Sequence, residues 1–136
     1  ANVSVSTESD EYQIVFKSED ESYFLRQEGG WWSIDGQDDR GQRYNATARM
    51  STFELVEKYL IWQWARIARS GSVDARLYKL GMAKDVHVEP TDREYFVELR
   101  VPTGSAILEQ ATATIFSHLI SKSVDEIEQM FTADAR

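Results

Sequence analysis

Hydrophobic and polar residues alternate in short runs through the first 50 residues of the chain. The runs cover residues 12–17, 23–26, 31–35 and 42–49, and polar or glycine-containing turns separate them. Period-two alternation is typical of strands, and the double glycine Gly29-Gly30 supplies the positive φ that a tight hairpin needs. The pattern predicts four antiparallel strands that follow one another as a meander.

Residues 51–69 carry a different, helical periodicity. Their apolar side chains fall on two faces of a helix, so this helix is expected to be covered on both sides. Ser51 and Glu54 have the spacing of a capping box at its start, and Gly71 is suited to end it. We therefore expect an α+β fold in which an antiparallel meander packs on or around one long central helix.

Further strands are predicted after this helix. Residues 84–89 alternate, with Val86 and Val88 facing inward, and residues 95–101 alternate as a second strand. Residues 76–80 fit either a strand or a helical turn.

The end of the chain is predicted to be helical. Apolar residues recur at helical spacing from Ile107 to Leu119, although β-branched residues also allow a strand that reaches about Gln110. Ser123 and Glu126 form a second capping box and predict a terminal helix.

Composition bounds the class of protein. The chain has 136 residues and is 42% hydrophobic, without an internal linker or repeat, which predicts a single domain over residues 1–136 with a frayed end at 1–10. It has no cysteine, no apolar run of membrane-spanning length and no secretory pattern at residue 1. These features favour a cytoplasmic location and no membrane partner.

Charge narrows the choice of partner. The net charge is −8, with the acids concentrated in the first and last thirds of the chain and the bases in the middle. Such a chain repels phosphate, so nucleic acid is not expected to bind. A basic protein partner or a cationic ligand is compatible with the charge, and solubility alone is the simpler explanation of it.

The sequence contains no recognisable catalytic or metal-binding motif. His87 is expected to face solvent, and Ser117 and His118 are neighbours that do not face each other on a helix. The acids of residues 35–39 lack the spacing of a calcium loop. No metal or cofactor is predicted, and nothing in the sequence promotes a catalytic site, although the 23 acids leave a close carboxylate pair for glycoside chemistry open.

The tryptophans come in two close pairs, Trp31 with Trp32 and Trp62 with Trp64. Strand and helix geometry direct the two rings of each pair apart, so each pair can give one ring to the core and one to a second surface. A two-sided core is the favoured interpretation, and an exposed Trp31 that anchors a partner is the alternative.

Three stretches together resemble a known family. They are Gly29-Gly30-Trp31-Trp32, the helix from Ser51 to Leu60, and the segment from Phe116 to Glu128. The combination is similar to actinobacterial immunity proteins, a family that includes the antitoxin of the tuberculosis necrotizing toxin, an NAD glycohydrolase. The resemblance implies a cytoplasmic, non-enzymatic antitoxin that binds its cognate toxin 1:1 and blocks the NAD-binding site.

The resemblance supplies no contact residues, so these are argued from physical requirements. An inhibitor of a cleft needs a narrow, protruding segment. Two segments fit this need, namely Ser70, Gly71 and Ser72 at the helix exit and Asp35, Gln37, Asp38 and Asp39 in the acidic loop. Trp31 is a further candidate, as an aromatic side chain that could anchor the partner. A plain helix end and a solvated turn are the structural alternatives. A secretion-chaperone-like protein-binding domain and a small-ligand-binding domain are the competing functions.

Overall fold

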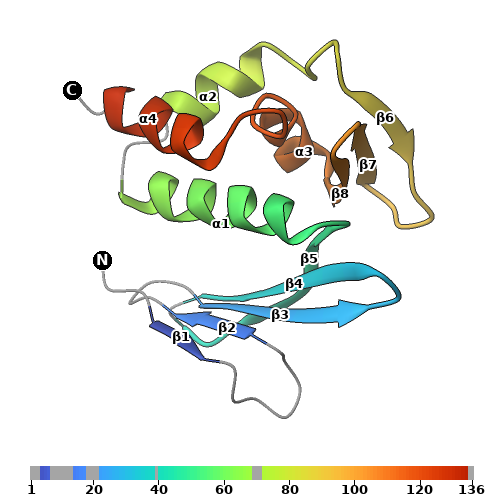
Figure 1. Cartoon of the computed structure of the whole chain (residues 1–136), viewed down its shortest axis with the longest axis vertical. Coiled ribbons are helices and arrows are strands. Elements are labelled where there is room, and N and C mark those ends of the chain that lie inside the picture. The colour runs from blue at the N-terminus through green and yellow to red at the C-terminus, as the bar shows by residue number, and fades with distance from the viewer. Residues whose placement is uncertain (1–3, 7–13, 18–21, 39, 69–71, 135–136) are drawn as a thin grey trace.

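The computed structural model describes residues 4–6, 14–17, 22–38, 40–68 and 72–134. This part of the chain forms eight strands and four helices, in which β1–β5 are followed by α1 and α2, and β6–β8 by α3 and α4 (Figure 1). The strands are β1 (Ser4–Ser6), β2 (Ile14–Lys17), β3 (Ser22–Glu28), β4 (Trp31–Gln37), β5 (Arg43–Met50), β6 (His87–Pro90), β7 (Phe96–Val101) and β8 (Gly104–Glu109). The helices are α1 (Phe53–Ala68), α2 (Ser72–Lys79), α3 (Gln110–Phe116) and α4 (Val124–Asp134).

All described strands form one antiparallel sheet in the order β1-β2-β3-β4-β5-β8-β7-β6. The predicted meander is confirmed as β2 to β5, and β1 is added within the end that was expected to fray. The two halves of the sheet join through a short pairing of Ala48–Met50 with Ala106–Leu108. Strand β5 begins five residues before this pairing, so its first part diverges from β8.

Helix α1 is the centre of the fold. It lies between the β3–β5 part of the sheet and the helices α2 and α4 (Figure 1). Side chains on both of its apolar faces are buried, namely Leu55, Val56, Tyr59, Leu60 and Trp62. The buried Lys58 also donates a 2.9 Å hydrogen bond from Nζ to the carbonyl oxygen of Ile120. The expected α+β fold with one long, doubly covered helix is confirmed.

The predicted cap of α1 is wrong by one residue. Thr52 Oγ1, not Ser51, accepts the hydrogen bond from the backbone N–H of Leu55, at 3.2 Å. Ser51 is engaged with the β7–β8 turn instead. Its Oγ accepts from Ser105 N at 2.7 Å, and its own N–H donates to Ser105 O at 2.9 Å. A long-range contact therefore replaces the local one.

The second capping box is confirmed. Ser123 N donates to Glu126 Oε1 at 2.9 Å, and Glu126 N donates to Ser123 Oγ at 3.1 Å. These hydrogen bonds with Ser123 lower the pKa of the Glu126 carboxyl. The terminal helix α4 begins here as expected.

In the middle of the chain the structure decides between alternatives that the sequence leaves open, and Val88 departs from its predicted inward position. Residues 76–80 belong mainly to helix α2, and the apolar run from Ile107 divides into strand β8 followed by helix α3. Val86 is buried as predicted, but Val88 is 36% exposed. Among the described strands, β6 is the last in the sheet order, so one of its edges is unpaired in this part of the chain.

Tyr95 was expected to begin the strand that continues to Val101. It lies in the turn before β7, with a φ of 67° and 71% exposure. The alternation of apolar residues does not reveal this left-handed backbone.

Candidate functional site

Helix α1 runs along the β3–β4 hairpin, and its two halves contact opposite ends of the hairpin. At the start of α1, Phe53 packs edge-on against Trp32, with ring centroids 5.2 Å apart. In its second half, Trp64 packs against Tyr23 at 6.0 Å, and Tyr23 pairs with Gly36 in the sheet. The exit of α1 and the end of β4 at Gln37 therefore lie at the same end of the molecule.

Asp35 is not part of an exposed acidic loop, contrary to our prediction. Strand β4 continues to Gln37, and Asp35 is only 1% exposed within it. Arg26 Nη2 lies 3.4 Å from Asp35 Oδ1, in an ion pair across β3 and β4. Pairing of the neighbouring strands extends β4 beyond the point that local alternation indicates.

Asp38 follows β4 and organises the turn into β5. Its Oδ1 accepts hydrogen bonds from the backbone N–H of Arg40 at 3.0 Å and of Gln42 at 2.9 Å. Its Oδ2 accepts a longer one from the Tyr44 hydroxyl at 3.4 Å. The side chain is thus fixed in a partly exposed turn, and the neighbouring Gln37 is half-buried.

The remaining predicted contact residues fall into separate places. Ser70, Gly71 and Asp39 lie outside the described residues, and Ser72 begins α2. Trp31 is half-buried at the β3–β4 turn, about 20 Å along β4 from Gln37. The structure therefore brings Gln37 and Asp38 to the exit end of α1 and leaves Trp31 at the other end.

A surface that sequence reasoning missed lies where β5 and β8 diverge. Three hollows of about 600, 570 and 150 Å³ follow one another there. The first two share Phe96 and Glu109, and the last two share Tyr44, Thr47 and Tyr59. The third also includes Gln37 and Asp38. A continuous groove results, built from segments far apart in sequence.

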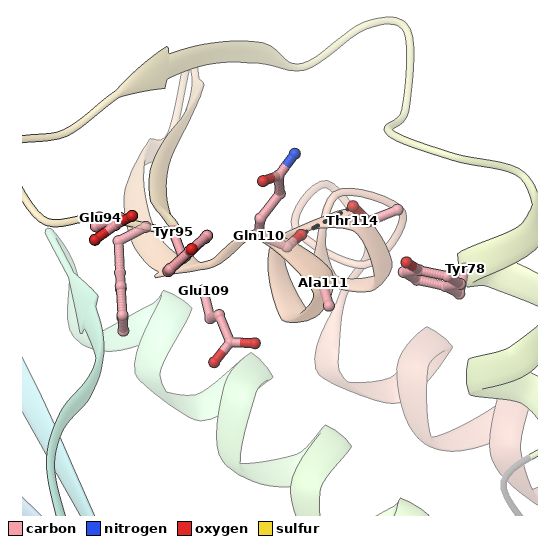
Figure 2. A pocket seen from close by; sticks show the side chains of 8 residues that line it. Tyr78, Glu94, Tyr95, Glu109, Gln110, Ala111 and Thr114 are labelled. Carbon is pink, nitrogen blue, oxygen red and sulfur yellow. Dashed lines mark hydrogen bonds between the residues drawn. The ribbon is translucent and has the colours of Figure 1, made fainter.

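The groove has the side chains of a protein-binding surface. Tyr44, Tyr78 and Tyr95 line it and are 45%, 54% and 71% exposed. Glu94 and Glu109 add carboxylates near Tyr95, across the hollow from Tyr78 (Figure 2). Tyrosine is enriched at interfaces because its rigid ring contributes contact area while its hydroxyl remains hydrogen-bonded. In the sequence, each of these tyrosines has the spacing expected of a buried residue. Only the folded structure shows that the three are exposed along one groove.

Ser117 and His118 both have structural hydrogen-bond partners. Ser117 Oγ donates to Thr114 O at 2.7 Å and accepts from Ala83 N at 2.9 Å. His118 Nε2 lies 2.6 Å from the carbonyl oxygen of Gly81. These contacts join the loop after α2 to the end of α3.

His87 is exposed on β6, as predicted, 2.5 Å from the carboxylate of Glu89. This hydrogen bond lowers the pKa of Glu89. Within the described ranges, no group of three or more histidine and carboxylate side chains is placed to hold a metal ion. No helix in these ranges has the length and hydropathy to cross a membrane.

A sequence model described as immunity protein 61 matches residues 1–135. This chain belongs to that immunity protein family. Membership supports an antitoxin role, in which an immunity protein binds a cognate toxin. No curated protein sequence matches the chain.

Among solved structures, Rv3902c from M. tuberculosis has a similar fold, with a TM-score of 0.65. The alignment covers 88% of this chain and 74% of that one at 17% identity. At this identity the likeness shows a shared fold.

Proposed function

We propose that this immunity protein neutralises a cognate secreted toxin by occluding the toxin's active site, as a 1:1 complex in the cytoplasm of the producing cell. The family match over residues 1–135 carries this proposal. The resemblance noted in the sequence adds that the toxin is of the NAD-glycohydrolase type. In this mode the protein catalyses nothing itself, because inhibition requires only a stable complex.

The end of the molecule that holds the α1 exit is proposed to face the toxin. Gln37, Asp38 and Ser72 belong to this end, and Ser70, Gly71 and Asp39 are retained as sequence-based candidates. The groove with its exposed tyrosines opens beside Gln37 and Asp38. Asp35 is omitted because it is buried, and Trp31 is omitted because it lies at the opposite end of β4.

The direct experiment uses the toxin domain encoded beside the gene for this chain. We expect size-exclusion chromatography with light scattering to show a 1:1 complex. Titration of the protein into the toxin should reduce NAD⁺ hydrolysis linearly to zero at one equivalent. A complex that leaves hydrolysis unchanged would contradict occlusion, and the absence of a complex would contradict the pairing itself.

The helix-exit candidates are tested by placing a bulky side chain there. Gly71→Trp is expected to abolish neutralisation while the thermal unfolding midpoint stays near that of the unmodified protein. Gln129→Trp is the control, because it adds the same ring at an exposed site on α4. Full protection by Gly71→Trp would show that the exit of α1 does not enter the toxin.

A further inference from the structure

The largest hollow of the groove has aromatic walls and an acidic rim. Tyr78 of α2 stands on one side, and Tyr95 stands on the other with Glu94 and Glu109 (Figure 2). Ala111 lies between them, where its small side chain leaves the space open. The volume is about 600 Å³, which is enough for a long side chain and part of its flanking chain.

The two carboxylates at the rim are available to a partner. Among the residues that the structure describes, neither Glu94 nor Glu109 forms a side-chain hydrogen bond or an ion pair. The guanidinium of the nearby Arg93 stacks on the Phe96 ring, 3.8 Å from its centroid. None of the described lysines, arginines and histidines lines this hollow. A cation would therefore meet aromatic faces and negative charge together.

We propose that this hollow is a socket for one arginine side chain of the cognate toxin. A guanidinium can stack on a tyrosine face and donate two hydrogen bonds to one carboxylate, whereas the lysine ammonium is a compact and strongly hydrated charge. The inference rests on the proposed toxin partner and names the chemistry that the toxin must present. It assigns Tyr78, Tyr95 and Glu109 as specificity residues.

The wall that carries Tyr95 is held in place before any partner binds. Thr91 Oγ1 donates to the carbonyl oxygens of Arg93 at 3.0 Å and Phe96 at 2.8 Å. The carbonyl oxygen of Tyr95 accepts a 2.8 Å hydrogen bond from Gln110 N, which joins this turn to the start of α3. A preformed socket avoids the ordering cost that a flexible loop would incur on binding.

The test measures the affinity of a catalytically inactive form of the toxin domain encoded beside this gene. Glu109→Gln and Tyr78→Ala are each expected to raise Kd roughly tenfold to a hundredfold, the range for losing a charge-assisted hydrogen bond or a central aromatic contact. Glu128→Gln is the matched control, because it removes the same charge from an exposed site on α4. Its Kd should stay within about twofold of the unmodified value.

The toxin side identifies the arginine. Each surface arginine of the toxin domain is replaced by lysine, and one replacement is expected to weaken binding and to lose its effect when combined with Glu109→Gln. If the unmodified protein binds the toxin domain but Glu109→Gln and Tyr78→Ala do not weaken the complex, the socket proposal is wrong and the antitoxin proposal stands. If the unmodified protein does not bind the toxin domain, both the socket proposal and the antitoxin proposal are wrong.

Discussion

The indole Nε1 of Trp62 donates a 2.9 Å hydrogen bond to Oδ1 of Asp74. Trp62 is fully buried in α1, and Asp74 is 8% exposed in the first turn of α2. The bond therefore fixes α2 on the central helix, directly after the predicted helix-exit contacts. Since α2 carries Tyr78, the same bond also holds one wall of the proposed socket.

Replacing Asp74 by alanine tests this connection. Asp74→Ala removes an acceptor from a buried indole N–H, which should lower the free energy of unfolding by about 1–3 kcal/mol. Urea unfolding followed by tryptophan fluorescence measures the change. Asp85→Ala is the control, because Asp85 is exposed in the turn before β6. Equal unfolding midpoints for the two variants would show that the bond contributes little.

Gly104 allows the start of α1 to approach the β7–β8 turn. A Cβ at this position would lie 2.7 Å from Ser51 Oγ and 3.0 Å from Leu55 Cδ1, and the φ of 153° disfavours other residues. Gly104→Ala should therefore destabilise the protein by about 1–3 kcal/mol, measured by urea unfolding. Gly36→Ala serves as the control, since a Cβ there meets nothing within 4 Å. Equal stability of the two variants would contradict the close approach.

The pH dependence of stability should contain a contribution from Glu126. The pKa of its carboxyl is lowered in the folded state by the hydrogen bonds with Ser123, so the stabilisation is present above the unfolded pKa near 4.5 and is lost as pH falls through the lower, folded value. Glu126→Gln should flatten this acidic part of the stability profile, measured by thermal unfolding between pH 3 and 7. Glu128→Gln removes a charge but no capping bond. A profile for Glu126→Gln that still falls as steeply as that of Glu128→Gln would argue against the effect.

Local sequence patterns predicted the elements whose contacts are local. The capping box of Ser123 and Glu126 closes within one helical turn, and the sequence places it correctly. The box expected at Ser51 fails because Ser105, distant in sequence, takes the Ser51 hydroxyl. Spacing along the chain carries no information about that competitor.

The candidate site was largely beyond prediction for the same reason. The groove combines residues from β3, β4, β5, β7, β8, α1, α2, α3 and the turn before β7. Asp35 is a buried partner of Arg26 through strand pairing, although the sequence places it at the start of an acidic stretch with Asp38 and Asp39. Only Gln37 and Asp38 among the described candidates lie on the groove.

Two substitutions of Tyr95 distinguish its effect on the stability of the fold from its effect on toxin binding. Tyr95→Gly and Tyr95→Ala both remove an exposed ring, but alanine keeps a Cβ on a backbone with a φ of 67°. Glycine adopts this conformation without steric cost, so Tyr95→Gly should be the more stable variant by about 1 kcal/mol in urea unfolding. Both variants should bind the toxin domain equally weakly, because each lacks the ring that forms one wall of the socket. Greater stability of the alanine variant would contradict the strain, whereas unmodified toxin affinity in both would remove Tyr95 from the interface.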